Sequence, residues 1–136
     1  MVIEHRLDEI KALKGKHEFL PRDEVTADIK NTVSLIRSGD SVVRKTMERD
    51  FSDADRSEIL HWLHNLGIGG DKVKVYWVSN LEGIRIQFED FASNYDELWH
   101  PGADDVIVIS SERTWILELN HEEIFSFYER RESHNQ

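Results

Sequence analysis

Two neighbouring carboxylates, Asp104 and Asp105, follow a histidine, His100, and are the side chains best suited to catalysis. Adjacent carboxylates beside a histidine can hold Mg²⁺ or Mn²⁺, which activates water for phosphoester hydrolysis. His121 could add a further ligand. This pattern allows a metal-assisted hydrolase as one function of the chain.

The same carboxylates also have a structural interpretation, which the sequence favours. Neighbouring residues on a strand point to opposite faces, so Asp104 and Asp105 can share an ion only if the strand has not yet begun. Carboxylates at the start of a strand commonly accept hydrogen bonds from backbone N–H groups. The prediction is therefore a protein without catalytic residues, bound metal or cofactor, and the hydrolase is the alternative.

A long acidic segment leads up to these residues. Residues 89–105 contain six acids and no Lys or Arg, namely Glu89, Asp90, Asp96, Glu97, Asp104 and Asp105. Connections longer than about 12–15 residues without structure of their own are commonly functional. Aromatic residues lie among the acids, and such a residue either plugs the loop onto a sheet or anchors a partner. The predicted partner-binding residues are Tyr95, Asp96, Glu97, Trp99, Asp104 and Asp105.

The distribution of charge indicates what kind of partner this would be. The net charge is −10, with 11 basic and 13 acidic residues in positions 1–70 but 6 basic and 14 acidic residues in positions 71–136. A surface of this sign repels the phosphates of nucleic acids and of anionic membranes. It attracts basic proteins and speeds their association. We therefore expect an acidic protein-binding module with a basic protein partner.

One stretch of the sequence resembles a known group of proteins. The run from Leu98 to Val106, with Trp115-Ile116-Leu117 and Asn120-His121-Glu122 after it, is similar to the closing hairpins of small bacterial proteins with a Leu-Trp-x-Pro-x-x-Asp-Asp core. Several of these proteins are regarded as immunity-type partners of toxins. The resemblance implies a shared sheet and loop and suggests a toxin-neutralising immunity protein. It implies no catalytic residue.

Length and composition predict the number of domains and the cellular location of the protein. A length of 136 residues suits one domain over 1–136. Cysteine is absent, no apolar signal sequence follows Met1, and no run of about 18 apolar residues exists to cross a membrane. These features predict a cytoplasmic protein, with a bacterial origin as the simplest interpretation.

The first half of the chain has the periodicity of helices. Apolar residues recur every three or four positions in 3–13, in 25–36 and in 59–66, and a shorter helix is predicted over Val42 to Met47. Ser52 is the predicted N-cap of the helix that contains 59–66. Three to four helices are thus expected within about 1–67.

The second half alternates with the period of strands. Residues 73–78 and 84–89 predict a hairpin with one buried face, and 106–109, apolar on both faces, predicts a central strand. Residues 115–119 and 124–128 complete the set, with a turn at Asn120-His121 in which the asparagine adopts positive φ. The predicted fold is α+β, with the helices packed on one face of an antiparallel meander of about five strands within about 72–130.

Overall fold

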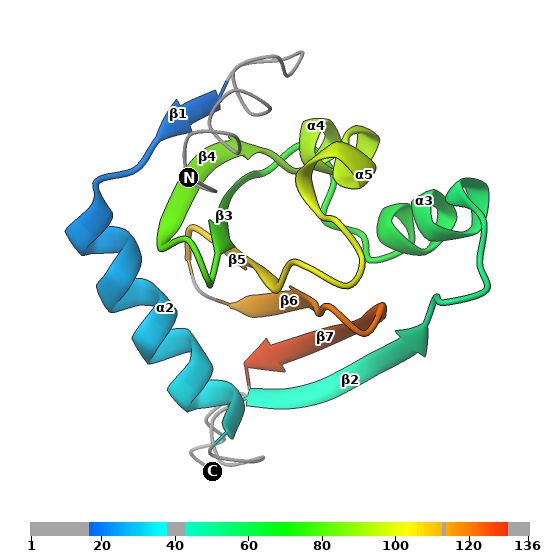
Figure 1. The fold of residues 1–136 in the computed structure, drawn as a ribbon, viewed down its shortest axis with the longest axis horizontal. Helices are drawn as coiled ribbons and strands as arrows, with labels where there is room; N and C mark the ends of the chain where they lie inside the picture. Colours follow the sequence, from blue (N-terminus) through cyan, green and yellow to red (C-terminus); the bar gives the residue numbers. More distant parts are fainter. Residues whose placement is uncertain (1–16, 38–42, 113, 131–136) are drawn as a thin grey trace, which may run out of the picture.

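The computed structural model describes residues 17–37, 43–112 and 114–130. Their centre is one antiparallel sheet in the order β1-β4-β3-β5-β6-β7-β2 (Figure 1). The strands are β1 (His17–Phe19), β2 (Val43–Asp50), β3 (Lys72–Trp77), β4 (Glu82–Gln87), β5 (Val106–Ser110), β6 (Trp115–Leu119) and β7 (Ile124–Arg130). The helix predicted within 3–13 lies outside the described residues.

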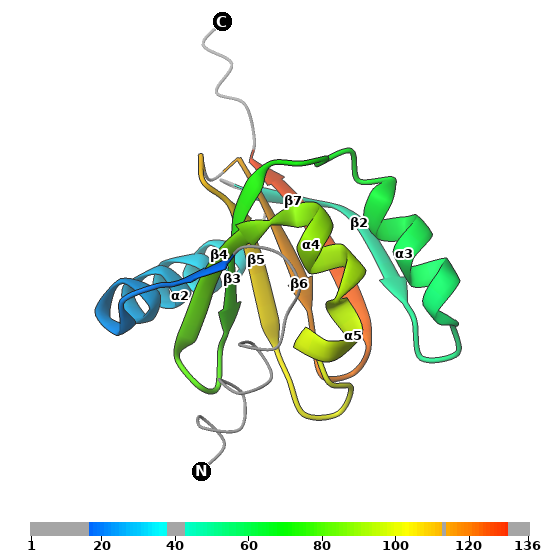
Figure 2. The same cartoon turned by 90° about the horizontal axis from the view of Figure 1, so that it is seen from above.

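Helices cover both faces of this sheet. The long helix α2 (Arg22–Arg37) connects β1 at one edge to β2 at the other and lies on one side of the sheet (Figures 1 and 2). On the other side lie α3 (Arg56–His64), α4 (Phe88–Ser93) and α5 (Tyr95–Leu98). None of the helices in the described ranges is long and apolar enough to span a membrane.

Two hydrophobic cores result, one on each face. Successive residues of a strand point to opposite faces. In β5, Val106 and Val108 join the core under α3, α4 and α5, whereas Ile107 and Ile109 join the core under α2. The strand that is apolar on both faces is therefore central, as predicted.

The predicted arrangement of helices and sheet was wrong. In the described residues four helices mostly alternate with seven strands, so neither an N-terminal helical block nor a five-strand meander exists. The predicted packing on one face also fails, because α2 covers Tyr76 on the face opposite the other helices. Of the helical patterns, residues 22–37 and 56–64 form α2 and α3.

The segment predicted as a short helix over Val42 to Met47 is part of β2. Its Arg, Lys, Met and Glu residues favour a helix locally, but propensity is weaker than tertiary pairing. Seven residues of β2 are in register with β7, and a shift in register falls between Lys45 and Met47. As an edge strand exposed along almost its whole length, β2 shows no apolar alternation that would identify it.

Two local assignments also need correction. The N-cap of α3 is Asp55, not Ser52, and its side chain accepts a hydrogen bond from the Glu58 N–H. In the β6–β7 turn the positive φ belongs to Glu123, at 67°. Asn120 contributes instead through its side-chain oxygen, which accepts from the N–H groups of Glu122 and Ile124.

The acidic segment is long because it crosses the sheet. Both β4 and β5 pair antiparallel with β3, from opposite sides, so β4 and β5 are parallel to each other. A parallel pair needs a crossover connection of about a dozen residues or more. That connection holds α4 and α5, so the length that suggested a functional loop has a topological reason.

Candidate functional site

The two aromatic residues predicted to bind a partner lie in the core. Tyr95 is 4% exposed and Trp99 is 3% exposed. The Trp99 indole nitrogen donates to the carbonyl of Asn120 at 3.2 Å, and its ring meets that of Phe125 edge-on at 5.0 Å. The Trp99 side chain therefore anchors the crossover between β4 and β5 to the sheet. This is the first of the two interpretations given above for an aromatic residue in the acidic segment.

The paired carboxylates bind different backbone groups. Asp104 is buried, and its Oδ2 accepts from the His100 N–H at 2.8 Å, which closes the turn 100–104. Oδ1 of Asp105 accepts from the His121 N–H at 2.9 Å and lies 3.0 Å from His121 Nδ1. This contact and the charge of Asp105 raise the pKa of the His121 imidazole.

This geometry does not favour the hydrolase alternative. His100, Asp104, Asp105 and His121 are close in space, but the two carboxylates are aimed at different partners. Over the described ranges no group of three or more His, Asp or Glu side chains is placed to hold a metal ion. The arrangement closes turns, and its acid–base contact is the one between Asp105 and His121.

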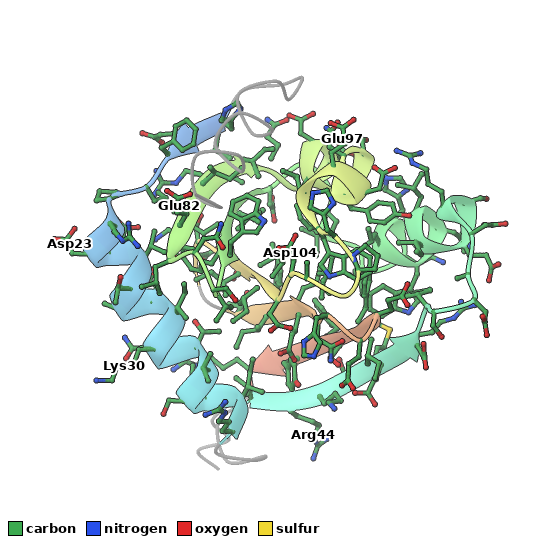
Figure 3. All side chains as sticks on the ribbon, viewed as in Figure 1. Asp23, Lys30, Arg44, Glu82, Glu97 and Asp104 are labelled. Carbon is green, nitrogen blue, oxygen red and sulfur yellow. The ribbon has the colours of Figure 1, made fainter. Side chains whose placement is uncertain are left out.

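The other two predicted residues, Asp96 and Glu97, are exposed on α5. Asp96 has a basic partner that the local sequence did not indicate, since Arg56 of α3 lies 3.0 Å from its carboxylate. Arg56 also donates to the Ser93 carbonyl at 2.7 Å. These contacts join α3 to both α4 and α5. Glu97 points away from the sheet at the rim of the molecule (Figure 3).

Three loops meet α5 at one end of the sheet. The Phe51 N–H donates to the Glu123 carbonyl at 2.8 Å, and the Gly102 N–H donates to the His121 carbonyl at 2.9 Å. These bonds join the loop after β2, the loop before β5 and the β6–β7 turn, along the lower edge of Figure 2. These loops, the last residue of β2 and α5 carry eight acidic residues: Asp50, Asp53, Asp55, Asp96, Glu97, Asp105, Glu122 and Glu123. We call these residues the acidic end.

The acidic end extends well beyond the predicted residues. Six of its eight carboxylates are exposed, and Asp105 and Glu123 are half-buried. Arg49 and Arg56 are at its border, paired with Glu58 and Asp96. Lys30 and Arg44 lie away from Glu97, on the sides of α2 and β2 (Figure 3). The sequence has acidic residues at 50–55 and 122–123, but only the fold shows that these segments lie beside the crossover between β4 and β5.

A second polar group lies on the α2 face of the sheet, and the sequence did not predict it. Register places Glu118 of β6 beside Ser126 of β7, and Ser126 beside Glu48 of β2. Tyr128 donates to Glu118 at 3.4 Å, Ser126 donates to Glu48 at 3.1 Å, and Lys45 lies 2.7 Å from Glu48. We call Lys45, Glu48, Glu118, Ser126 and Tyr128 the strand cluster.

Glu118 is the perturbed acid of this cluster. Burial raises the pKa of its carboxyl, and the charges of Asp105 and Glu48 raise it further. The hydrogen bond from Tyr128 and the charge of Lys45 act in the opposite direction. Burial and the charge of Glu118 in turn raise the pKa of the Tyr128 hydroxyl. Lys45 is bonded to Glu48, which raises the pKa of Lys45 and lowers that of Glu48.

Replacing Glu118 with glutamine is expected to stabilise the protein at neutral pH. A carboxyl with a raised pKa binds its proton more tightly in the folded chain, so its contribution to stability falls as pH rises from the ordinary Glu pKa through the folded one. Glutamine keeps the size and the acceptor but carries no charge. The free energy of unfolding at pH 7 should rise by about 0.5–1 kcal/mol, and the difference should vanish near about pH 4.

Urea denaturation at the two pH values measures this, with Glu129→Gln as the matched control. Glu129 is exposed on β7, so its replacement makes the same charge change without relieving burial. A loss of stability at pH 7 in Glu118→Gln alone would contradict the prediction, because it would show that the ionised carboxylate is well accommodated.

Comparison with protein-family models, with curated proteins and with solved structures finds no match to this chain. The resemblance of residues 98–123 to immunity-type proteins therefore stays a prediction. Function has to be argued from the two polar surfaces described above.

Proposed function

We propose that this protein is a non-enzymatic binding module whose acidic end binds a basic protein. The observation that carries the proposal is the convergence of α5 and three loops on one surface with eight carboxylates. Loops at the end of a rigid sheet commonly carry binding residues, because the scaffold positions them and their variation does not disturb the core.

Electrostatics explains why a basic partner suits this surface. Exposed like charges repel one another, each close pair by roughly 0.2–1 kcal/mol, so the acidic end slightly destabilises the free protein. Lys and Arg side chains on a partner would relieve that repulsion, and the field of the acidic end would steer the encounter. Nucleic acids and anionic membranes carry the same sign as this surface and are not proposed as partners.

A toxin-neutralising immunity protein is the most concrete form of this proposal. Nuclease toxins grip phosphates with basic surfaces, and a compact acidic surface can cover such a site. The resemblance of residues 98–123 supports this form, which requires the cytoplasmic location that the sequence predicts, because a toxin would have to be intercepted there. A gene directly downstream of a secreted-toxin gene would support it independently.

The test uses two variants with equal change in net charge. In one, Asp53, Asp96, Glu97 and Glu122 of the acidic end become Asn or Gln. In the control, the exposed acids Glu18, Asp71, Glu112 and Glu129, outside the acidic end, are replaced in the same way. Asp104 is kept, because its carboxylate closes a turn.

The acidic-end variant is expected to bind the basic partner about tenfold or more slowly at low salt, with little change in dissociation rate. Association of the wild type should slow as ionic strength reaches the physiological range, where the screening length is about 8–10 Å. Stopped-flow or surface plasmon resonance measures both rates. Equal slowing in both variants would mean that net charge alone matters, and binding indifferent to salt and to both variants would contradict the proposal.

A further inference from the structure

One guanidinium group at the border of the acidic end is held by three different groups. Nε of Arg56 donates to Oδ2 of Asp96 at 3.0 Å, and its Nη2 donates to the Ser93 carbonyl at 2.7 Å. The guanidinium carbon also lies over the ring of Tyr95, 5.9 Å from the ring centre. A carboxylate, a carbonyl and an aromatic face are the groups that bind arginine side chains in protein interfaces. We call Ser93, Tyr95 and Asp96 the guanidinium site.

The guanidinium site belongs to the crossover between β4 and β5. Ser93 is the last residue of α4, so its carbonyl has no donor within that helix. Tyr95 and Asp96 are the first two residues of α5, and Tyr95 is buried while Asp96 is exposed. Arg56 comes from α3, forty positions earlier in the chain than Asp96. The crossover therefore forms the site, and Arg56 is a separate side chain that occupies it.

Arg56 can leave the guanidinium site at little cost. The side chains of Arg56 and Asp96 are 50% and 46% exposed. Ion pairs this exposed contribute little to stability, because water screens them and because fixing two long side chains costs entropy. The helix α3 has other supports, since Asp55 caps its first turn and Ile59 and Leu63 are buried in the core. It does not depend on Arg56 for its place on the sheet.

We propose that Arg56 occupies the guanidinium site in the free protein and that an arginine side chain of the basic partner replaces it in the complex. This inference rests on the proposed function and names arginine, rather than lysine, as the anchoring side chain of the partner.

Two properties of the site favour this exchange. The planar guanidinium offers separate N–H donors to the carboxylate and the carbonyl and a flat face to the ring, whereas the ammonium of lysine is a compact point charge. The surface of a docked partner also shields its own arginine from water, which strengthens a charge-assisted hydrogen bond. Arg56 has no such shield in the free protein, because half of its side chain is exposed.

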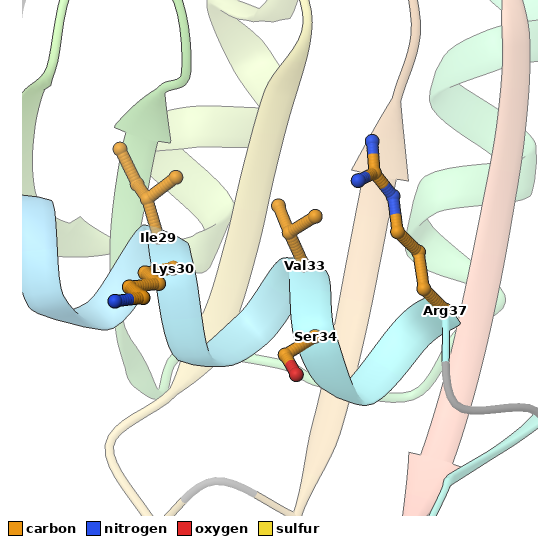
Figure 4. A pocket seen from close by; sticks show the side chains of 5 residues that line it. All are labelled: Ile29, Lys30, Val33, Ser34 and Arg37. Carbon is orange, nitrogen blue, oxygen red and sulfur yellow. The ribbon is translucent and has the colours of Figure 1, made fainter.

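The open pocket on α2 does not suit the same ligand. Its volume is about 590 Å³, and its described lining is Ile29, Lys30, Val33, Ser34 and Arg37 (Figure 4). This lining carries two cations and no carboxylate, so it repels an incoming arginine. A basic partner is therefore directed away from α2 and toward the acidic end.

The experiment compares two capped peptides of equal charge, hexa-arginine and hexa-lysine, on the full chain at low salt. Arg56→Ala empties the guanidinium site, and Arg44→Ala is the matched control, because Arg44 is exposed on β2, away from Glu97 (Figure 3). Titration calorimetry should show that Arg56→Ala binds the arginine peptide about fivefold more tightly than Arg44→Ala does, since the site is no longer occupied. The lysine peptide should bind both variants within about twofold.

Two further measurements separate exchange at the site from a change in net charge or in folding. Arg56→Lys keeps the charge and should still bind the arginine peptide more tightly than the wild type, because lysine cannot meet the carboxylate, the carbonyl and the ring together. In the wild type, the nuclear magnetic resonance signal of the Arg56 Nε–H group should move toward that of a free guanidinium when the arginine peptide is added.

The outcomes distinguish this inference from the proposed function. If Arg56→Ala and Arg44→Ala bind the arginine peptide equally, and the Arg56 signal does not move, the inference is overturned. Slower association of the acidic-end variant with the basic partner would then still support the proposed function. If the Arg56 signal moves with the arginine peptide but the acidic-end variant associates like the wild type, the guanidinium site stands and the proposed function fails.

Discussion

Replacing Trp99 with alanine is expected to destabilise the protein by about 3–5 kcal/mol, the range for large aromatic residues removed from a core. Trp99 is 3% exposed, packs edge-on against Phe125 and bonds the carbonyl of Asn120. The replacement would leave a cavity beside Phe125, and the Asn120 carbonyl would keep only its bond from the Glu123 N–H. The crossover would lose the side chain that holds it to the sheet.

Urea denaturation of Trp99→Ala and of the neighbouring control Glu97→Gln measures this effect. Glu97 is exposed, so its replacement should change the free energy of unfolding by less than about 0.5 kcal/mol. The local sequence also allowed Trp99 to be a surface anchor that slows dissociation of a partner, although it favoured the role that holds the loop to the sheet. A Trp99→Ala variant of unchanged stability and faster partner dissociation would support that role and refute the core role.

Replacing Gly83 with alanine is expected to cost about 3 kcal/mol, at the upper end for overpacking in a tight core. An added Cβ would lie 2.4 Å from Cδ1 of Tyr76 and 3.1 Å from Cγ2 of Val25. The Tyr76 ring cannot simply swing aside, because it is fully buried and its hydroxyl donates to Asp28 of α2. Relief of the clash would have to move α2 away from β3 and β4.

Gly70→Ala is the matched control for this prediction. A Cβ at Gly70 would meet only the end of the Glu89 side chain, at 3.8 Å, and the φ of Gly70 is not in the left-handed region. Its replacement should change stability by less than about 0.5 kcal/mol. Thermal unfolding compares the two variants, and equal midpoints would show that α2 is not packed closely over Gly83.

Alternation in the sequence was sufficient to identify the strands that bury at least one face. Residues in β3, β4, β6 and β7 alternate, and β5 is apolar from Val106 to Ile109, so these strands and the central place of β5 could be predicted. Helical spacing was equally sufficient for α2 and α3. In each case burial imposes a local period on the residue types, and a local period can be read without knowing what the element packs against.

The strand β2 and the helices α4 and α5 could not be predicted in this way. Exposure of β2 removes the period-2 pattern, and its helix-forming residues become a strand because β7 supplies hydrogen bonds from about eighty residues away. The crossover became helical because it has to travel over β3 and bury Phe91 and Leu98 against the sheet. Pairing partners decide both outcomes, and partners have no local signature.

Residue types alone predicted an acidic surface, but only the tertiary structure decided which acids share it and which aromatic residues are accessible. Tyr95 and Trp99 look like surface residues between acids, yet the crossover turns them inward. Glu118 looks like the polar position of an ordinary alternating strand. Its neighbours come from other strands, and the bond from Ser126 to Glu48 in the same cluster joins residues 78 positions apart. A shift of one residue in the register of β2 or β7 would send these side chains to opposite faces, so the cluster exists only once the whole sheet has formed.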